Sequence, residues 1–169
     1  ETIADDILKA ITKINPKDKV DVVFAIDSTG SMKDDIEVLR KEFVPKLEKE
    51  LHNFKSLRLG LLLYRDYGDN YNYKNMPVKF MDFTKDVNKF YNQLNNFKIY
   101  GTEGGDIPEA VYEALYSSLE FYNWDNNAIK KIILIGDAEP HPKPRGIRIK
   151  CTREMVYNKD KQKGVIIDT

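Results

Sequence analysis

One stretch near the amino end of the 169-residue chain, Val20 to Met32, reads VDVVFAIDSTGSM. Its first seven residues are apolar apart from Asp21, and several are β-branched or aromatic. A continuous apolar run that stops at turn residues is typical of a strand buried on both faces of a parallel sheet. Such a strand constrains the whole chain, because helices must then cover both faces of that sheet.

The residues that follow this strand carry oxygen atoms at alternate positions. Asp27, Thr29 and Ser31 are spaced two apart, and on a tight loop this spacing can direct one carboxylate and two hydroxyl groups at a common point. Hard oxygen ligands of this kind suit Mg²⁺, Mn²⁺ or Ca²⁺. A simpler interpretation is a strand-to-helix turn in which Thr29 or Ser31 caps the helix.

The remainder of the chain alternates between helix-like and strand-like segments. Apolar residues at helical spacing predict an amphipathic helix or lead-in over residues 1–16, and a helix of about five turns from Met32 to Leu51 that Pro45 should bend. Further segments have the length and pattern of strands or helices. We expect strands at Leu57–Tyr64, Val78–Phe83, Lys130–Gly136 and Val165–Ile167, and helices at Asp86–Phe97, after Asp106, and at Lys150–Gln162.

This order of elements predicts an α/β domain over residues 17–169 with a Rossmann-like, doubly wound sheet. The sheet should be mostly parallel with one antiparallel edge strand, and helices should lie on both faces. Ligands of such sheets bind beyond the carboxyl ends of the strands, where the strand order reverses. Asp27, Arg65-Asp66 and Asp137 each follow a predicted buried strand, so they should emerge at the same edge.

A glycine turn with an acidic residue is a further candidate for this edge. The turn Gly104-Gly105-Asp106 reaches the edge only if the helix Asp86–Phe97 returns the chain to it, which the antiparallel strand allows. Two interpretations of Asp106 stay open. It can ligate a cation, directly or through water, or it can be the N-cap of a capping box completed by Glu109.

Composition narrows the class of ligand. Lys+Arg and Asp+Glu both number 27, so the net charge is zero, which gives no general electrostatic case for binding nucleic acid or an anionic membrane. No apolar run approaches the roughly 20 residues that cross a bilayer, and the single cysteine excludes an internal disulfide.

The long polar loop Arg65–Pro77 contains several tyrosines, among them Tyr71 and Tyr73. They suit protein recognition or carry no function.

Three motifs in this order resemble the von Willebrand factor A-type domain, the fold of integrin I domains. Asp27-x-Thr29-x-Ser31 matches the first element of the family's metal-ion-dependent adhesion site, and Asp137 in ILIGDAEPH matches the third. The segment GGDIPEAV stands where the second element belongs, but has Asp106 where integrins place a threonine. The chain looks like a branch of the family that occurs in bacterial proteins and beside eukaryotic atypical kinase domains.

The resemblance covers residues 19–168 and implies a site with defined roles. A divalent cation is implied at the sheet edge, Mg²⁺ with Mn²⁺ or Ca²⁺ as alternatives, and an acidic residue of a protein partner would complete its coordination shell. For Arg65 and Asp66, which can pair with each other, and for His141 between two prolines, we favour a structural role, with contact to a ligand as the alternative. The residues that match the metal site are Asp27, Thr29, Ser31, Asp106 and Asp137, and those expected on the rim are Arg65, Asp66, Tyr67, Thr102 and His141.

Two departures from the family pattern bear on function. Asp106 in place of threonine adds a negative charge, which favours tighter metal binding and makes the ion less electrophilic toward a partner. Family members usually add a strand and a C-terminal helix after the position of Val165–Ile167, and in integrins that helix moves during switching. We therefore expect either a fragment or a domain without that switch. Family habit favours an extracytoplasmic or cell-surface location, with a cytoplasmic one as the alternative.

Two other functions compete with a metal-dependent interaction module. An aspartate after a buried strand also marks haloacid-dehalogenase-like phosphoryl-transfer hydrolases. Those need a second aspartate where Thr29 stands, and the P-loop, GxSxG and HExxH motifs are missing, so the sequence predicts a non-enzymatic domain. The other alternative is an intramolecular scaffold that docks onto a longer polypeptide and uses the metal only structurally. The sequence predicts no oligomeric state.

Overall fold

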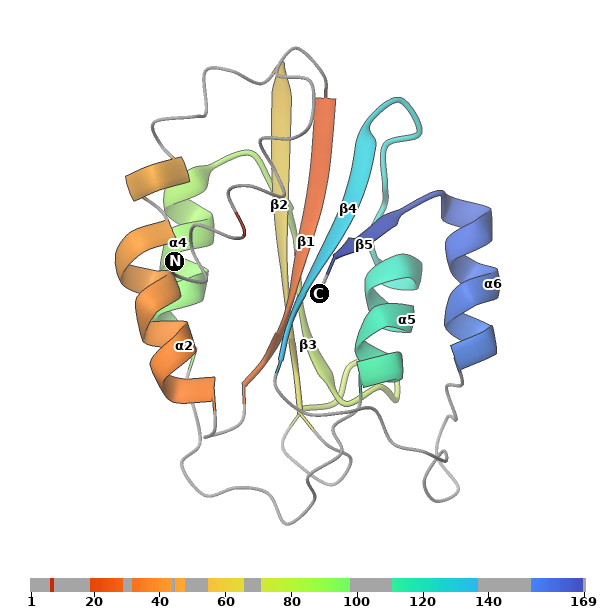
Figure 1. The fold of residues 1–169 in the computed structure, drawn as a ribbon, viewed down its shortest axis with the longest axis horizontal. Coiled ribbons are helices and arrows are strands. Elements are labelled where there is room, and N and C mark those ends of the chain that lie inside the picture. Colours follow the sequence, from red (N-terminus) through yellow and green to blue (C-terminus); the bar gives the residue numbers. More distant parts are fainter. Residues whose placement is uncertain are drawn as a thin grey trace.

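The computed structural model describes residues 7, 19–28, 32–43, 45–47, 55–65, 71–97, 111–136 and 153–168. Within these ranges the chain forms a five-stranded sheet with helices packed against it (Figure 1). The elements in chain order are β1 (Lys19–Asp27), α2 (Lys33–Val38), the π-helical segment η2 (Leu39–Phe43), β2 (Ser56–Tyr64), β3 (Val78–Thr84), α4 (Val87–Asn96), α5 (Val111–Phe121), β4 (Ile129–Ile135), α6 (Arg153–Lys163) and β5 (Ile166–Asp168).

β1 is the central strand of the sheet, whose order is β3-β2-β1-β4-β5. It pairs in parallel with β2 on one side and β4 on the other, so that Ile26 lies opposite both Leu63 and Ile135. β5 continues the parallel part beside β4, whereas β3 runs antiparallel on the outer edge of β2. The predicted mostly parallel sheet with one antiparallel edge strand is confirmed.

Helices cover both faces of this sheet: α2, η2 and α4 lie on one, and α5 and α6 on the other (Figure 1). The side chains of β1 alternate between two apolar clusters. Phe24 and Ile26 belong to the cluster beneath α2 and α4, and Val23 and Ala25 to the cluster beneath α5. All four side chains are fully buried, as expected for a strand enclosed on both faces.

Three phenylalanine rings join β1 to the helices of the first face. The ring of Phe24 lies 5.2 Å from that of Phe43 in η2 and 5.3 Å from that of Phe90 in α4. Edge-on and tilted aromatic pairs contribute beyond the apolar area that they bury. These contacts hold η2 and α4 against the strand that ends in Asp27.

The helix after β1 differs from the predicted continuous helix. Its first α-helical part, α2, ends at Val38, Leu39–Phe43 form a π-helical segment ahead of Pro45, and residues 45–47 are α-helical again. Proline has no N–H and its ring crowds the carbonyl four residues earlier, here that of Lys41, so the preceding turn widens. The disturbance expected at Pro45 therefore takes the form of a π-helical segment. Residues 48–51, the end of the predicted helix, lie outside the described ranges.

A tight turn shapes the loop before β3. Lys74 and Asn75 have φ angles of 50° and 69°, and Tyr73 and Met76 pair across them, which is the pattern of a two-residue type I′ turn. The ring of Tyr73 stacks on that of Phe80 with 5.0 Å between the ring centres. Tyr73 is thus half-buried and packs against the second face, and its role in recognition stays a prediction.

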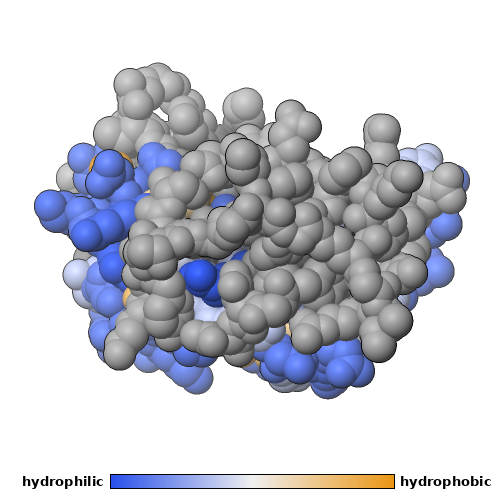
Figure 2. Space-filling model, turned by 90° about the horizontal axis from the view of Figure 1, so that it is seen from below, coloured by the Kyte–Doolittle hydropathy of each residue, from blue (hydrophilic) through white to orange (hydrophobic). Residues whose placement is uncertain are grey.

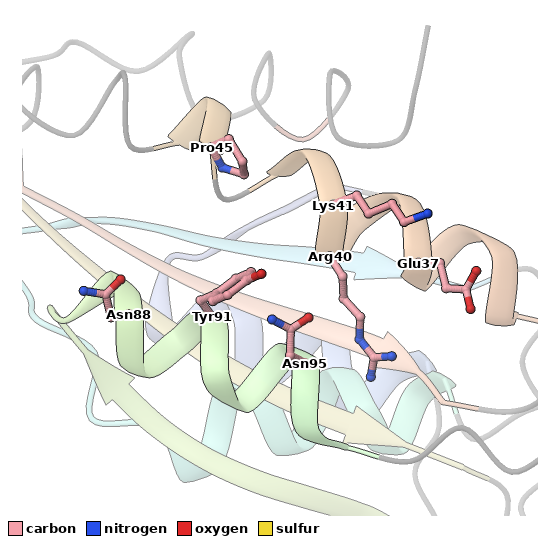
Figure 3. A pocket seen from close by; sticks show the side chains of 7 residues that line it. All are labelled: Glu37, Arg40, Lys41, Pro45, Asn88, Tyr91 and Asn95. Atoms are coloured by element: carbon pink, nitrogen blue, oxygen red, sulfur yellow. The ribbon is translucent and has the colours of Figure 1, made fainter.

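Arg40 ties η2 to the carboxyl end of α4. Its Nε donates to the carbonyl of Leu94 at 2.7 Å, and its Nη2 donates to that of Phe97 at 2.8 Å. Figure 3 shows this side chain beside a groove of about 670 Å³ between the two helices. Burial lowers the pKa of the Arg40 guanidinium, which nevertheless stays charged at neutral pH. A cation is favourable at the last carbonyls of a helix.

Replacing Arg40 with alanine should lower the free energy of unfolding by about 1–2 kcal/mol, because hydrogen bonds from a charged donor to two helix-terminal carbonyls are lost. Urea unfolding followed by circular dichroism measures the loss. Lys41→Ala is the matched control, since Lys41 is the next residue of η2 and is exposed. It should change the free energy of unfolding by less than about 0.5 kcal/mol. Equal losses in both variants would contradict the anchoring role of Arg40.

Candidate functional site

The strand order reverses at β1. From β1 the chain moves through β2 to β3 on one side, while β4 and β5 lie on the other side. In an open α/β sheet, such a reversal leaves a crevice between the carboxyl ends of the flanking strands, here β1 and β4. These ends lie at the lower edge of the sheet in Figure 1, which we call the carboxyl edge.

Asp27, the last residue of β1, lies at this crevice. Its side chain is fully buried, and its backbone lies opposite Tyr64 of β2. The end of β4 is close on the other side: a Cβ atom added to Gly136 would lie 3.5 Å from the Cβ of Asp27 and would collide with the Tyr64 hydroxyl. Glycine allows this close approach. The chain that leads from β4 to position 137 therefore passes directly beside Asp27.

Ser28 fixes the direction in which the chain leaves β1. Its N–H donates to the carbonyl of Tyr64 at 3.1 Å, and its hydroxyl lies 3.3 Å from that of Tyr71. The guanidinium of Arg65 donates from Nη1 to the Ser28 carbonyl at 3.0 Å. The loop that carries the next predicted ligands thus starts from a fixed point beside Asp27.

Arg65 and Tyr71 have structural contacts. Arg65 was predicted on the rim with a structural role favoured over ligand contact, and the structure agrees: the residue is 5% exposed and its backbone N–H bonds to the Pro77 carbonyl at 3.2 Å. Tyr71 is half-buried and packs against the first apolar cluster. Arg65 also brings a positive charge to the residue next to Asp27, where it helps to offset a buried carboxylate.

The start of α2 bears on the simpler interpretation of the loop after β1. The helix begins at Lys33 with Met32 at its N-cap position, and the Met32 side chain makes no capping hydrogen bond. Met32 itself belongs to a 3₁₀ turn that leads into α2. Thr29 and Ser31 lie outside the described residues, so their interpretation as helix caps stays a prediction.

Most of the predicted site lies outside the described residues. Within the described part, no three His, Cys, Asp or Glu side chains are grouped as metal ligands. The convergence of the other ligands on Asp27 therefore stays a prediction, although Asp137 directly follows Gly136 in sequence. Eight of the ten candidate residues fall in undescribed ranges: Thr29, Ser31, Asp66, Tyr67, Thr102, Asp106, Asp137 and His141.

The sheet topology brings both ends of the segment that contains Asp106 to the carboxyl edge. β3 runs antiparallel and ends at the opposite edge, so α4 returns the chain to the carboxyl edge and α5 leaves from it, as predicted (Figure 1). Residues 98–110, between these helices, lie outside the described ranges. Arg40 anchors the first end of this segment. The sequence analysis did not identify this role of Arg40, because the carbonyl groups that it binds are 54 and 57 positions away in the chain and no local pattern reveals them.

Seen from the carboxyl edge, the described surface is mostly hydrophilic around its margin (Figure 2). The large exposed apolar side chains of the described part, Tyr157 and Ile166, belong to α6 and β5. The groove beside Arg40 is a separate feature between η2 and α4, and Asp27 is not among the residues that line it: Glu37, Arg40, Lys41, Pro45, Asn88, Tyr91 and Asn95 (Figure 3).

Sequence comparison identifies related proteins. A family model of the von Willebrand factor A domain matches residues 21–150. The alpha-protein kinase vwkA of Dictyostelium discoideum is 26% identical over 140 residues, which are 81% of this chain and 21% of that protein. The chain therefore spans about a fifth of the length of this relative.

Among the described residues, no helix is long and apolar enough to cross a membrane.

Two solved structures have the same fold. The pilus adhesin SpaC from Lactobacillus rhamnosus GG, in its open conformation, has a TM-score of 0.57 and 17% identity, and the match covers 89% of this chain and 23% of that one. Proximal thread matrix protein 1 from the mussel byssus, with a zinc-occupied MIDAS motif, has a TM-score of 0.59 and 13% identity, over 89% of this chain and 37% of that one. At these identities the likeness shows the fold alone.

Gly136→Ala should lower the free energy of unfolding by about 1–3 kcal/mol, because the added methyl group collides with the Tyr64 hydroxyl beside Asp27. Tyr64→Phe removes that hydroxyl and should reduce the cost of Gly136→Ala by at least about 1 kcal/mol. Urea unfolding of the two single variants and the double variant measures this coupling. Additive losses would show that the end of β4 does not pack on Tyr64 as described.

Proposed function

The chain belongs to the von Willebrand factor A family, since the family model matches well over half of its length, and on that premise we propose that it is a protein-interaction module that holds a divalent cation at its carboxyl edge. The observation that carries this proposal is Asp27, a fully buried carboxylate at the end of the central strand, where the strand order reverses. Carboxylate oxygens are the ligands that Mg²⁺ and Ca²⁺ take in proteins, and a reversal of strand order is where open α/β sheets bind their ligands.

The proposed ligand set consists of oxygen atoms alone. Asp27 would act with Thr29 and Ser31 from the loop after β1, and with Asp137 after β4, either directly or through water. Asp106 would join them or cap its own helix. Such a set suits Mg²⁺ or Mn²⁺, with Ca²⁺ as an alternative. When bound, the cation would offer an open position to a carboxylate of the partner protein.

The described residues would position this site without touching the partner. Ser28 and Arg65 hold the start of the ligand loop, and Gly136 allows the end of β4 to approach Asp27. Contacts with the partner would come from loops that follow β2, α4 and β4. The residues proposed for this rim are Asp66, Tyr67, Thr102 and His141.

The names of the related proteins bear on where the protein acts and on whether this domain is an enzyme. One structural neighbour is a pilus adhesin and another is a matrix protein of the mussel byssus, so we propose an extracytoplasmic location and no enzymatic step in this domain. The relative vwkA is named a kinase, but the chain matches only 21% of it. That name is therefore no argument for phosphoryl transfer by this chain.

A second candidate is docking within a longer polypeptide. The matched region is 21% of vwkA, 23% of SpaC and 37% of the byssus protein, so in each of them the domain is one part of a larger chain. In this alternative the cation stabilises the carboxyl edge, and another segment of the same polypeptide occupies it. The two candidates share the metal site and differ in the origin of the carboxylate.

Isothermal titration of metal-free protein with Mg²⁺, Mn²⁺, Ca²⁺ and Zn²⁺ tests the cation site. We expect one site for Mg²⁺ or Mn²⁺ with a dissociation constant below about 1 mM, and a melting temperature that rises with metal concentration by mass action. Asp27→Asn should abolish both effects. Asp34→Asn is the matched control, because Asp34 is exposed in the first turn of α2. Wild-type protein that binds no divalent ion at millimolar concentration would overturn the proposal.

A Mn²⁺ complex tests whether a carboxylate completes the shell. Exchangeable water on the bound ion should enhance the relaxation rate of bulk water protons, and an Ala-Glu-Ala peptide should reduce this enhancement by displacing water. Both peptides have an acetylated N-terminus and an amidated C-terminus, and Ala-Gln-Ala is the control, since its side-chain amide lacks the charge of a carboxylate. If both peptides act alike, the metal site stands but recognition of an acidic residue is refuted.

A further inference from the structure

A second cavity lies at the opposite end of the sheet from Asp27. It has a volume of about 670 Å³ and is bounded by the starts of β1 and β2, the turn after β3 and the connection from α5 to β4. These segments meet at the upper edge of the sheet in Figure 1. We call this cavity the amino-edge pocket. Nine residues of β1 at about 3.3 Å each place it about 30 Å from the carboxyl edge.

The amino-edge pocket concentrates positive charge in a chain whose net charge is zero. Lys19, Lys55, Arg58 and Lys85 all line it, against a single acidic lining residue, Asp125. Lys55 and Lys85 are exposed and Lys19 is half-buried. Among the described residues, none of the three lysines forms an ion pair. Their charge is therefore available to a ligand.

A buried carboxylate makes the pocket rigid. Asp21 of β1 accepts hydrogen bonds from Nε and Nη2 of Arg58 at 2.7 Å and 2.6 Å, and from the N–H of Asp125 at 2.9 Å. Arg58 also donates to the carbonyl of Asn123 at 3.0 Å and stacks on the ring of Phe83. The floor and one wall of the pocket are thus held in place before any ligand binds, which lowers the entropic cost of binding.

The remaining lining favours a peptide over a simple anion. Asn123, Asn126 and Asn127 are exposed, and an amide side chain can donate to and accept from a peptide backbone at once. The carboxylate of Asp125 can accept a peptide N–H, a donor that a phosphate ion does not have. Trp124 is 7% exposed and its indole N–H is bonded to the Ser118 carbonyl, so it offers no open ring face for stacking a nucleobase.

We propose that the amino-edge pocket binds an acidic peptide segment, with the three lysines pairing with its carboxylates and the asparagine amides with its backbone. The binding is independent of metal and of the carboxyl edge. Because the two edges lie about 30 Å apart, the domain can engage an acidic segment at one edge while its other edge is occupied. This property suits a module that connects parts of an assembly.

Fluorescence anisotropy with a labelled (Glu-Ser)₄ peptide tests the proposal, in buffer with a chelator so that a metal site cannot contribute. The peptide should bind, and salt should weaken the binding by screening. Lys55→Glu/Lys85→Glu should weaken it at least about tenfold, because like charges then face the ligand. The matched control, Lys79→Glu/Lys89→Glu, reverses two exposed lysines outside the pocket and should change affinity less than about twofold.

Three results would overturn the inference. They are equal binding of a (Gln-Ser)₄ peptide, equal losses in the two double variants, and displacement of the peptide by equimolar inorganic phosphate, which would indicate a general anion site. Thermal unfolding of both double variants should match that of the wild type, because all four lysines are exposed. A second measurement, backbone amide NMR shifts at residues 123–127 on addition of (Glu-Ser)₄, should locate the binding at the pocket wall.

Discussion

The burial of β1 on both faces is the constraint on which the rest of the structure depends. Its side chains from Val22 to Ile26 are fully buried, so the strand can lie only at the centre of a sheet that helices cover on both sides. The chain must then cross over between parallel strands, and the order of the sheet must reverse at β1. The crevice at the carboxyl edge follows from that reversal.

β1 carries a buried carboxylate near each of its ends, and the two carboxylates have different surroundings. Asp21 is compensated inside the domain, where Arg58 forms a two-point ion pair with it and Asp125 donates its N–H. Asp27 stands at the edge where loops leave the sheet, beside the buried guanidinium of Arg65 and the close approach of Gly136. The first carboxylate consolidates the fold. The second is the carboxylate proposed as a metal ligand, because it lies where ligands of such sheets bind.

The antiparallel strand β3 decides what else can reach the carboxyl edge. A parallel strand in that position would have placed the next helix in the opposite direction, and the segment between α4 and α5 would begin at the amino edge. Instead α4 runs back toward Asp27, and Arg40 holds its last carbonyls against η2. The π-helical geometry before Pro45 is part of the segment that presents this arginine. The π-helical segment η2 thereby helps to hold the end of α4, from which the chain continues toward the candidate site.

The sequence by itself determined the strands, the helices and the mostly parallel sheet, because apolar periodicity and turn residues are local signals that burial of the core must satisfy. It also placed Asp27 at the end of the central strand. Only the tertiary structure decided the partners of the polar residues: Arg65 bonds to the Ser28 carbonyl, Tyr71 and Tyr73 are half-buried against the apolar clusters, and Arg40 caps a helix far along the chain. Their partners come from distant segments, so their roles depend on packing that no local pattern encodes. The same holds for the amino-edge pocket, whose charges come from separate elements that only the folded sheet brings together.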